Sequence, residues 1–538
     1  MTHYMKNKRL GKVGYAAVKL DMSKAYDRVE WSFLQKMMEK LGFCNQWVEV
    51  IMKFVSSVSY RIKVNGDLSE EFFPERGLRQ GDPLSPYLFL IYAEGFSALL
   101  RRAEEEGKIK GIKICPGAPS VSHLLFADDS LILCRANGGD AQQLQSLLQV
   151  YEECSGQMIN KDKSAVMFSP NTPTGEREEV MSALQIAKET TNERYLGLPV
   201  YVGKEKSKVF QFLKERIWQR IQGWKEKLLS RAGKEILIKA VAQAIPTYAM
   251  TCFDITKGVC EQISSMICKY WWSNQDKDRK MHWISWDTLT KSKNQGGLGF
   301  RDIHIFNLAM LAKQGWRLLH SPDSFCGRIL KAKYFPKCSV LEAKPRGGIS
   351  YTWRSILNGI EVIKSGLVWR VGNGESIKIW EDPWIPDRST RRPISSKGHN
   401  LLVRVAELLD PLTGSWNEQL VQQTFEEEDV KFILAIPLQT DMEDIPAWHA
   451  DNRGIFSVRS AYKVHKKAIR QQSRQGTTSS SSAPNAEEQF WKKLWKIKCP
   501  GKIKHFAWRL AHNTLALRMT LRSRNGNKLS LCDLTKCK

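Results

Sequence analysis

Two apolar runs flank an Asp-Asp pair in the segment VSHLLFADDSLILC, residues 121–134. Apolar runs on both sides of a short polar turn predict two neighbouring strands joined as a hairpin. A second short strand, predicted over residues 18–21, also ends on an acid, Asp21. Because apolar strands pack side by side in a core, this arrangement can bring Asp21, Asp128 and Asp129 together at one end of a sheet.

Convergent carboxylates repel one another unless a cation binds them. Oxygen ligands without neighbouring Cys or His suit Mg²⁺ or Mn²⁺, and a pair of such ions can serve phosphoryl transfer. Each acid also has an ordinary structural explanation, because Asp favours turns and helix caps through local hydrogen bonds. The pattern therefore predicts a carboxylate site for two cations, with purely structural acids as the alternative.

Five motifs occur in a fixed order along the first 200 residues: VKLDMSKAYDRV, GLRQGDPLSPYLF, FADDSLIL, SGQMINKDKS and YLGLPV. At these residues the chain resembles the reverse transcriptases of plant LINE-type, non-LTR retrotransposons. The resemblance implies an RNA-directed DNA polymerase that uses two Mg²⁺ or Mn²⁺ ions to add nucleotides to a primer 3′-OH. It also implies an RNA template, a DNA primer or target and deoxynucleoside triphosphates (dNTPs) as partners.

The resemblance assigns a role to each motif residue. The three acids would be catalytic metal ligands, with Asp128 the firmer of the acidic pair. Tyr26 would be an aromatic gate that leaves no room for a ribose 2′-hydroxyl, and Gln80 and Gly81 would lie against the incoming nucleotide and template. Lys163 would lie near the triphosphate. From the residues alone, a core tyrosine is the preferred explanation of Tyr26, and Lys163 has a strong alternative explanation as one of many surface lysines.

Mixed strand and helix signals predict an α+β fold, with an antiparallel palm sheet and packed helices followed by a helical thumb and a mixed Trp/Gly-rich region. Asn65-Gly66 predicts a hairpin within residues 59–73, and Gly42 predicts the end of a preceding helix. From the N-terminus we expect a palm with fingers largely missing (1–200), a helical thumb-like segment (201–255), a Trp/Gly-rich linker domain (256–400), a connecting region (401–475), a Ser-rich flexible linker (476–487) and a truncated zinc-binding module (488–538).

The chain is strongly basic, with 82 Lys and Arg against 56 Asp and Glu and a net charge of +26. Such a field attracts polyanions, and nucleic acids are the usual ones. No apolar run is long enough to cross a membrane, and the basic N-terminus lacks the apolar segment of a secretory signal. The 12 Cys follow no disulfide framework. We therefore expect an intracellular protein of the nucleus or cytoplasm, without a membrane partner.

Two windows, 201–240 and 490–538, interleave cations with aromatic residues, as single-stranded nucleic-acid binders do. An amphipathic helix that buries its Trp residues in a core has the same spacing, so this alternative stays open. The oligomeric state is not predicted. The candidate nucleic-acid-binding residues are Lys225, Lys227, Arg231, Lys234, Lys492, Lys493, Lys502 and Lys504.

Two departures from the family pattern lead to further expectations. The family places fingers strands before the first motif, whereas 20 residues precede Asp21 here. A structural zinc site needs four ligands. The tail offers Cys532 and Cys537, and Cys499, His505 or His512 would have to complete the set. We therefore expect no intact zinc site and a poorly ordered segment over 515–538, and we keep a catalytically inactive nucleic-acid-binding fragment as the alternative function.

Overall fold

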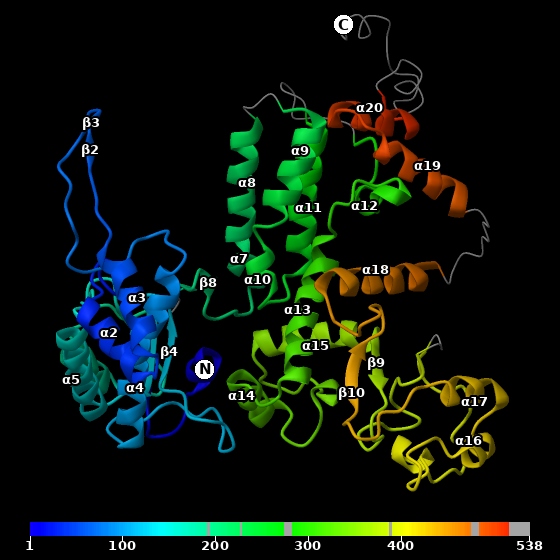
Figure 1. Cartoon of the computed structure of the whole chain (residues 1–538), viewed down its shortest axis with the longest axis horizontal. Helices are drawn as coiled ribbons and strands as arrows, with labels where there is room; N and C mark the ends of the chain where they lie inside the picture. The colour runs from blue at the N-terminus through cyan, green and yellow to red at the C-terminus, as the bar shows by residue number, and fades with distance from the viewer. Residues whose placement is uncertain (191–193, 226–228, 274–281, 387–389, 475–483, 516–538) are drawn as a thin grey trace, which may run out of the picture. The chain divides into compact units, whose positions relative to one another are not determined.

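The computed structural model describes residues 1–190, 194–225, 229–273, 282–386, 390–474 and 484–515 (Figure 1). The chain divides into two compact units, which we describe separately. The first unit contains Met1–Tyr201 and Phe325–Pro336, and the second contains Val202–Ser324 and Lys337–Lys538. The predicted end of the palm at residue 200 lies beside this division. Residues 325–336, which we expected in the linker domain, lie in the first unit.

The first unit is built on an antiparallel sheet with the strand order β4-β5-β1-β6. Alternate residues of β5 point to opposite faces, as the period of a strand requires. Ile132 and Cys134 join one hydrophobic core, and Leu131 and Leu133 join another. The strands are β1 (Tyr15–Leu20), β4 (His123–Phe126), β5 (Asp129–Arg135) and β6 (Ala165–Phe168).

Helices cover the face of the sheet that carries Ile132 and Cys134 (Figure 1). One of them, α5, begins and ends where the sequence supplies a cap. The Asn137 side chain accepts the Asp140 N–H at the start of α5, and Gly156 ends the same helix with a φ of +73°. These helices are α2 (Trp31–Lys40), α3 (Asn45–Ser56), α4 (Ser85–Glu105), α5 (Gly138–Ser155) and α6 (Thr174–Leu184).

The opposite face of the sheet is covered by the short N-terminal helix α1 (Thr2–Asn7). Met5 of α1 is fully buried against Ala17, Leu131 and Leu133, and Ile329 of α14 (Phe325–Tyr334) packs against the same core. A small hairpin of β7 (Arg194–Tyr195) and β8 (Leu198–Pro199) contributes Tyr195 to this core. Both faces of the sheet are therefore closed to water along most of its length.

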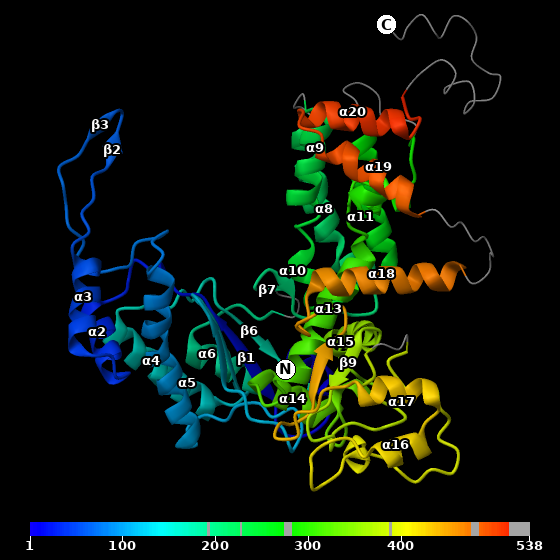
Figure 2. The ribbon, with the colours of Figure 1, turned by 45° about the vertical axis from the view of Figure 1, so that its right-hand side comes forward.

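The predicted hairpin around Asn65-Gly66 is confirmed. Strand β2 (Lys63–Val64) pairs with β3 (Asp67–Leu68), and Asn65 and Gly66 have φ values of +53° and +106°. Asn and Gly are the residues that tolerate this left-handed turn geometry. Both views show this hairpin projecting from the rest of the first unit (Figure 2).

The second unit begins with a helical region, as predicted for residues 201–255. Its central contact joins α13 and α15, where a Cβ on Gly359 would lie 2.5 Å from the backbone of Leu311 and Ala312. A glycine is needed here because the two helix backbones approach so closely. The helices are α7 (Lys206–Val209), α8 (Gln211–Lys225), α9 (Arg231–Leu237), a π-helix (Ile238–Ala242), α10 (Thr247–Met250), α11 (Lys257–Trp272), α12 (Trp286–Thr290), α13 (Ile303–His320) and α15 (Tyr351–Lys364).

Residues 371–436 of the second unit pack around Trp384, which is fully buried. Here β9 pairs with β10 over Leu367–Arg370 and Ile445–Trp448. The other helices are α16 (Glu418–Thr424), α17 (Glu427–Leu434), α18 (Val458–Arg474), α19 (Pro484–Lys496) and α20 (Gly501–Ala511), with 3₁₀ turns over Lys293–Gln295, Val340–Glu342 and Val405–Leu408.

These elements confirm the predicted α+β fold. The predicted Ser-rich linker lies outside the described residues up to 483, and its last residues already belong to α19. The tail over 516–538 also lies outside the described residues. In the described part of the chain, every helix is too short or too polar to cross a membrane.

Candidate functional site

The sheet brings the three predicted acids to one end of the β1–β5 pair. Leu20 is paired with Ser130, so Asp21, which follows β1 directly, lies opposite Asp129 at the start of β5. Asp128 occupies the turn between β4 and β5, which is closed by the pairing of Phe126 with Asp129. Asp128 is exposed, and the other two acids are half-buried.

The acids influence one another electrostatically. Burial raises the pKa of Asp129, and the negative charges of Asp128 and Asp21 raise it further, while the Lys19 ammonium opposes the change. Like charges disfavour the ionised form of a carboxyl group. A bound divalent cation would relieve this repulsion, and carboxylate oxygens are the ligands that Mg²⁺ and Mn²⁺ prefer.

Three carboxylates are suitable ligands for a divalent cation. However, they do not form the shared metal-binding site that the sequence predicted. Among the described residues, no group of three or more His, Cys, Asp or Glu side chains is arranged to hold a metal ion. The three acids share one end of the sheet without surrounding a single point. The identity of Asp21, Asp128 and Asp129 as metal ligands stays a prediction.

The turn that carries Asp128 is strained. Ala127 has a φ of +50°, in the left-handed region that residues with a Cβ rarely adopt. Such a conformation costs on the order of 1–3 kcal/mol and is concentrated at functional sites. The strain is consistent with a turn that is selected for the placement of its acid.

Tyr26 lies beside the acidic turn. Burial raises the pKa of its phenol, and the negative charge of Asp128 raises it further. The ring stacks on Phe89 with centroids 4.7 Å apart, and the Tyr26 carbonyl accepts the Leu78 N–H at 2.8 Å. The ring is half-buried, so it contributes to the core and also presents a surface near Asp128.

Gln80 and Gly81 lie on an exposed loop that leads into α4. Gly81 has a φ of +88°, and a Cβ built there would meet no atom within 4 Å. The loop ends where the Asp82 carboxylate accepts the Leu84 N–H at 2.8 Å. The open space around Gly81 leaves room for a ligand to approach the backbone closely. That this ligand is a nucleotide or template is a prediction from the sequence alone.

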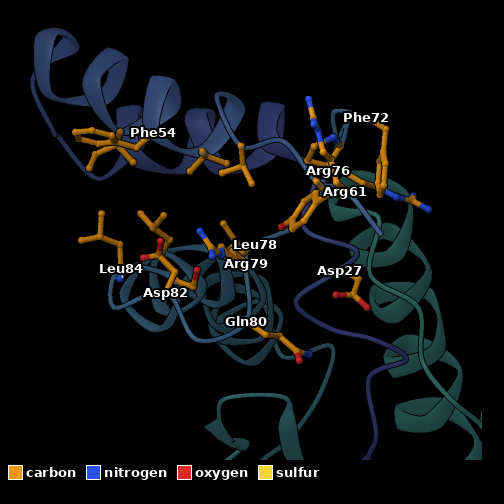
Figure 3. A pocket seen from close by; sticks show the side chains of 18 of the residues that line it. Asp27, Phe54, Arg61, Phe72, Arg76, Leu78, Arg79, Gln80, Asp82 and Leu84 are labelled. Carbon is orange, nitrogen blue, oxygen red and sulfur yellow. Dashed lines mark hydrogen bonds between the residues drawn. The ribbon is translucent and has the colours of Figure 1, made fainter. Parts of the chain in front are cut away.

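Gln80 also lines a cavity of about 560 Å³ between α3, the arms of the β2–β3 hairpin and this loop (Figure 3). Its walls are mainly apolar, with Phe54 and Phe72 on opposite sides. Two of its arginines already face carboxylates, because Arg61 lies 3.5 Å from Glu71 and Arg76 lies 3.3 Å from Glu30.

Lys163 is exposed and lies next to a residue that supports Asp21. The Ser164 hydroxyl accepts the Asp21 N–H at 3.1 Å, and the Asn160 side chain accepts the Lys163 N–H at 3.2 Å. The backbone of Lys163 is therefore fixed near the acids. Among the described residues, its ammonium makes no recorded contact with them, so its role also stays a prediction.

The prediction that Lys234 and Arg231 bind nucleic acid is wrong for this conformation. Lys234 is buried, and its ammonium donates to the Ser273 carbonyl at 2.7 Å, where it closes the end of α11. Arg231 lies over the rings of Trp271 and Trp272 at 5.6 and 5.7 Å, and burial lowers its pKa to about 10. Both cations therefore make contacts within the second unit. Lys227 and the side chain of Lys225 lie outside the described residues.

In the C-terminal window the structure confirms the alternative in which the Trp residues are core. Trp508 is 0% exposed and donates to the Gly296 carbonyl at 2.8 Å, and Trp491 is also buried. The cations differ from the rings: Lys492, Lys493 and Lys502 are exposed. Lys504 is half-buried and donates to the Trp495 carbonyl at 3.1 Å. The exposed lysines stay candidates for phosphate contacts.

The histidines that we considered as additional zinc ligands have other partners. His505 Nε2 lies 2.8 Å from Glu235 Oε2, and His512 Nε2 lies 2.7 Å from the Gly296 carbonyl. Cys532 and Cys537 lie outside the described residues, as does the segment that we expected to be poorly ordered, from residue 516 onward. The Nε2 atoms of His505 and His512 are therefore engaged in contacts within the described part of the chain.

The buried carboxylate of Glu235 allows a test of what stabilises the second unit. Burial alone would raise its pKa, but His505, Lys239 and Lys293 together lower it to about 2. A lowered carboxyl pKa stabilises the fold above the unfolded value of 4.5, and this contribution is lost as the pH falls from there toward 2. We expect Glu235→Gln to lower the free energy of unfolding at pH 7 by about 3 kcal/mol.

Urea unfolding between pH 7 and pH 3 measures this effect. The loss of stability on acidification should be smaller in Glu235→Gln than in the wild type. Glu205→Gln removes an exposed pair with Lys208 and should change the stability by less than about 0.5 kcal/mol. Equal acid sensitivity of Glu235→Gln and the wild type would contradict the assignment.

Comparisons with known proteins find two family models that match parts of the chain. The family model described as reverse transcriptase (RNA-dependent DNA polymerase) matches residues 3–200. The model described as zinc-binding in reverse transcriptase matches residues 456–538. Residues 3–200 belong to the reverse transcriptase family. An uncharacterized mitochondrial protein of Arabidopsis thaliana is 42% identical over 153 residues, which cover 28% of this chain and 99% of that protein.

Other relatives of this reverse transcriptase family member are retrotransposon proteins, which confirms the predicted resemblance. A Pol polyprotein from the type-1 retrotransposable element R2 of Popillia japonica is 30% identical over 31% of this chain. An uncharacterized 149 kDa protein of the transposon TX1 of Xenopus laevis is 26% identical over 55% of this chain. The chain spans only 26% and 22% of these two relatives. A telomerase structure from Candida albicans is 12% identical, and the match covers 62% of this chain and 53% of that one. The TM-score is 0.27, so this structural similarity carries no argument.

Proposed function

We propose that this chain is an RNA-directed DNA polymerase that adds deoxynucleotides to a primer 3′-OH. One observation supports the proposal above the others. Within the segment that matches the reverse transcriptase family, Asp21, Asp128 and Asp129 lie at one end of the sheet, and burial together with the charges of Asp128 and Asp21 raises the pKa of Asp129. Acids that only stabilise turns would not need to lie so close together that their negative charges repel one another.

In this proposal the three acids hold the divalent cations. When bound, two Mg²⁺ or Mn²⁺ ions supply positive charge to the attacking and leaving oxygens of the phosphoryl transfer. The stacked Tyr26 ring faces the sugar of the incoming dNTP and excludes a 2′-hydroxyl. Gln80 and Gly81 lie against the nucleotide and template, and the Lys163 ammonium neutralises or protonates the departing pyrophosphate.

The exposed lysines of α19 and α20 would add contacts to the RNA template and the DNA primer or target. The zinc-binding family match over residues 456–538 supports a metal-binding role for that region of the family. Zinc needs four ligands, and Cys532 and Cys537 supply two. Because His505 and His512 have other partners, we propose that this chain alone binds zinc weakly.

A primer-extension assay with an RNA template, a DNA primer, four dNTPs and Mg²⁺ tests the proposed function. Extension that is abolished by EDTA supports it. The alternative is a nucleic-acid-binding fragment without catalysis, which the net charge of +26 also favours. That alternative predicts salt-sensitive binding of RNA and DNA with no extension at any Mg²⁺ concentration.

Tyr26→Ala should increase ribonucleotide use by this polymerase. Removing the ring opens space for a 2′-hydroxyl, and a single steric contact of this kind is worth about 10- to 100-fold in discrimination. The measurement is the ratio of kcat/KM for CTP to that for dCTP. Tyr87→Ala, which truncates a ring that is 68% exposed on α4, is the control. An unchanged ratio in Tyr26→Ala would return Tyr26 to a purely structural role.

A further inference from the structure

The segment that follows α5 runs antiparallel to the loop between Asp21 and Tyr26. The Asn160 N–H donates to the Asp21 carbonyl at 2.8 Å, and the Ser23 N–H donates to the Met158 carbonyl at 2.8 Å. Met22 and Ile159 form a bridge between these two contacts. The motif SGQMINKDKS is thereby joined to the loop that carries the proposed gate.

Gln157 makes the last contact of this series with its side chain. It is 3% exposed, and its Nε2 donates to the Ala25 carbonyl at 2.9 Å. Ala25 directly precedes Tyr26 in the chain. The contact joins residues that are 132 positions apart, so it is a tertiary support of the loop rather than a local turn.

The backbone of Gln157 is itself fixed on its N-terminal side. Its N–H donates to the Ser155 hydroxyl at 3.3 Å. Gly156 has a φ of +73°, and a Cβ there would lie 2.6 Å from the Glu30 side chain. Only a glycine fits this approach, so the amide of Gln157 has little freedom to shift away from Ala25.

Tyr26 is supported from its other side by the loop before α4. Its carbonyl accepts the Leu78 N–H at 2.8 Å, and its ring stacks on Phe89. Gln157 and Leu78 therefore hold the peptide groups on the two sides of Tyr26. Loss of either contact would allow the ring to shift relative to Asp128.

The buried amide of Gln157 is costly for the fold. Its Oε1 is buried and accepts no hydrogen bond within the described part of the chain. A buried acceptor without a partner is destabilising, and an apolar side chain of similar size would avoid this cost. The amide provides the Nε2 contact with Ala25 and a side-chain hydrogen bond with Tyr92, and an apolar side chain would provide neither.

We propose that Gln157 is a positioning residue that sets the Tyr26 ring and thereby contributes to the selection of deoxyribonucleotides over ribonucleotides. It acts through the Ala25 peptide and touches no substrate. The inference rests on the proposed polymerase function for its kinetic consequence. The positioning itself can be tested without any activity.

The kinetic test compares Gln157→Leu with Gln149→Leu, which changes an exposed glutamine on the preceding helix α5. In Gln157→Leu, the ratio of kcat/KM for CTP to that for dCTP should rise about tenfold, as expected for the loss of one hydrogen bond. Gln149→Leu should leave this ratio unchanged. An unchanged ratio in Gln157→Leu, with normal dCTP incorporation, would overturn the specificity role.

The structural test measures hydrogen exchange of the Leu78 amide, which donates to the Tyr26 carbonyl. We expect about tenfold faster exchange in Gln157→Leu than in the wild type or Gln149→Leu. Unchanged exchange would overturn the positioning role. If the wild type itself shows no polymerisation, the proposed function fails, and this exchange measurement alone decides whether Gln157 positions Tyr26.

Gln157→Glu provides a second variant of the same shape. Its carboxyl group can donate to the Ala25 carbonyl only when it is protonated, and burial favours the protonated form. Relative to the wild type at each pH, Leu78 exchange should be near normal at about pH 5 and accelerated at about pH 8. Equal relative exchange at both pH values would contradict a role for this hydrogen bond.

Discussion

Asp128→Asn should lower the rate of primer extension by about 10³-fold or more. A neutral amide is a poor ligand for Mg²⁺, and loss of the cation charge at the phosphoryl group removes several kcal/mol of transition-state stabilisation. The exposed turn position of Asp128 means that the substitution should not disturb the core. Single-turnover extension at saturating dNTP measures the effect.

Asp67→Asn is the matched control, because Asp67 is an exposed turn acid of the same unit on the β2–β3 hairpin. It should extend primers at close to the wild-type rate. The Asp128→Asn variant should also keep the wild-type affinity for a primer–template duplex. Extension by Asp128→Asn within a factor of about ten of the wild type would remove Asp128 from the catalytic set.

Trp508→Ala should lower the free energy of unfolding of the second unit by about 3–5 kcal/mol, as expected for truncation of a buried Trp. The ring is 0% exposed, and its Nε1 donates to the Gly296 carbonyl at 2.8 Å. Urea unfolding followed by tryptophan fluorescence suits this test. Of the 18 Trp residues, all except Trp31 and Trp47 belong to the second unit.

Phe506→Ala separates the structural from the binding role of the same helix. Phe506 lies on α20 and is 57% exposed, so its truncation should change the stability by less than about 0.5 kcal/mol. If α20 contacts nucleic acid, this variant should weaken RNA binding while Trp508→Ala unfolds more easily. A large loss of stability in Phe506→Ala, or none in Trp508→Ala, would contradict the observed burial.

Local sequence signals predicted much of the first unit. The Asn65-Gly66 turn, the stop at Gly42 and the hairpin around Asp128 each depend on a few neighbouring residues, and each is present in the structure. The strand before Asp21 starts earlier than expected, at Tyr15. Its first residues pair with β5 and β6, and such long-range pairing leaves no local signal.

The basic window of α9 shows why the remainder was not predicted. Lys234 and Arg231 occur at helical spacing beside aromatic residues, which is equally typical of a binding surface and of a core. Their partners, the end of α11 and two of its Trp rings, lie 36 or more residues along the chain. Only the tertiary arrangement distinguishes the two interpretations.

In the candidate site, too, local signals predicted some residues and tertiary contacts determined others. Asp21, Asp128 and Asp129 could be predicted because each ends a strand or occupies a turn. Gln157 was contained in a recognised motif, but its partner, the Ala25 carbonyl, is a backbone group that no residue pattern reveals. Support of this kind becomes visible only when two distant segments are seen to pair.

Single-nucleotide incorporation on an RNA template tests the proposed function most directly. The full chain is incubated with Mg²⁺, a DNA primer and one dNTP at a time, on four RNA templates that differ only in the first unpaired base. We expect that the primer is extended by the complementary dNTP alone on each template and that EDTA abolishes the reaction. No extension under conditions where the primer–template is bound, or extension that ignores the template base, would contradict an RNA-directed DNA polymerase.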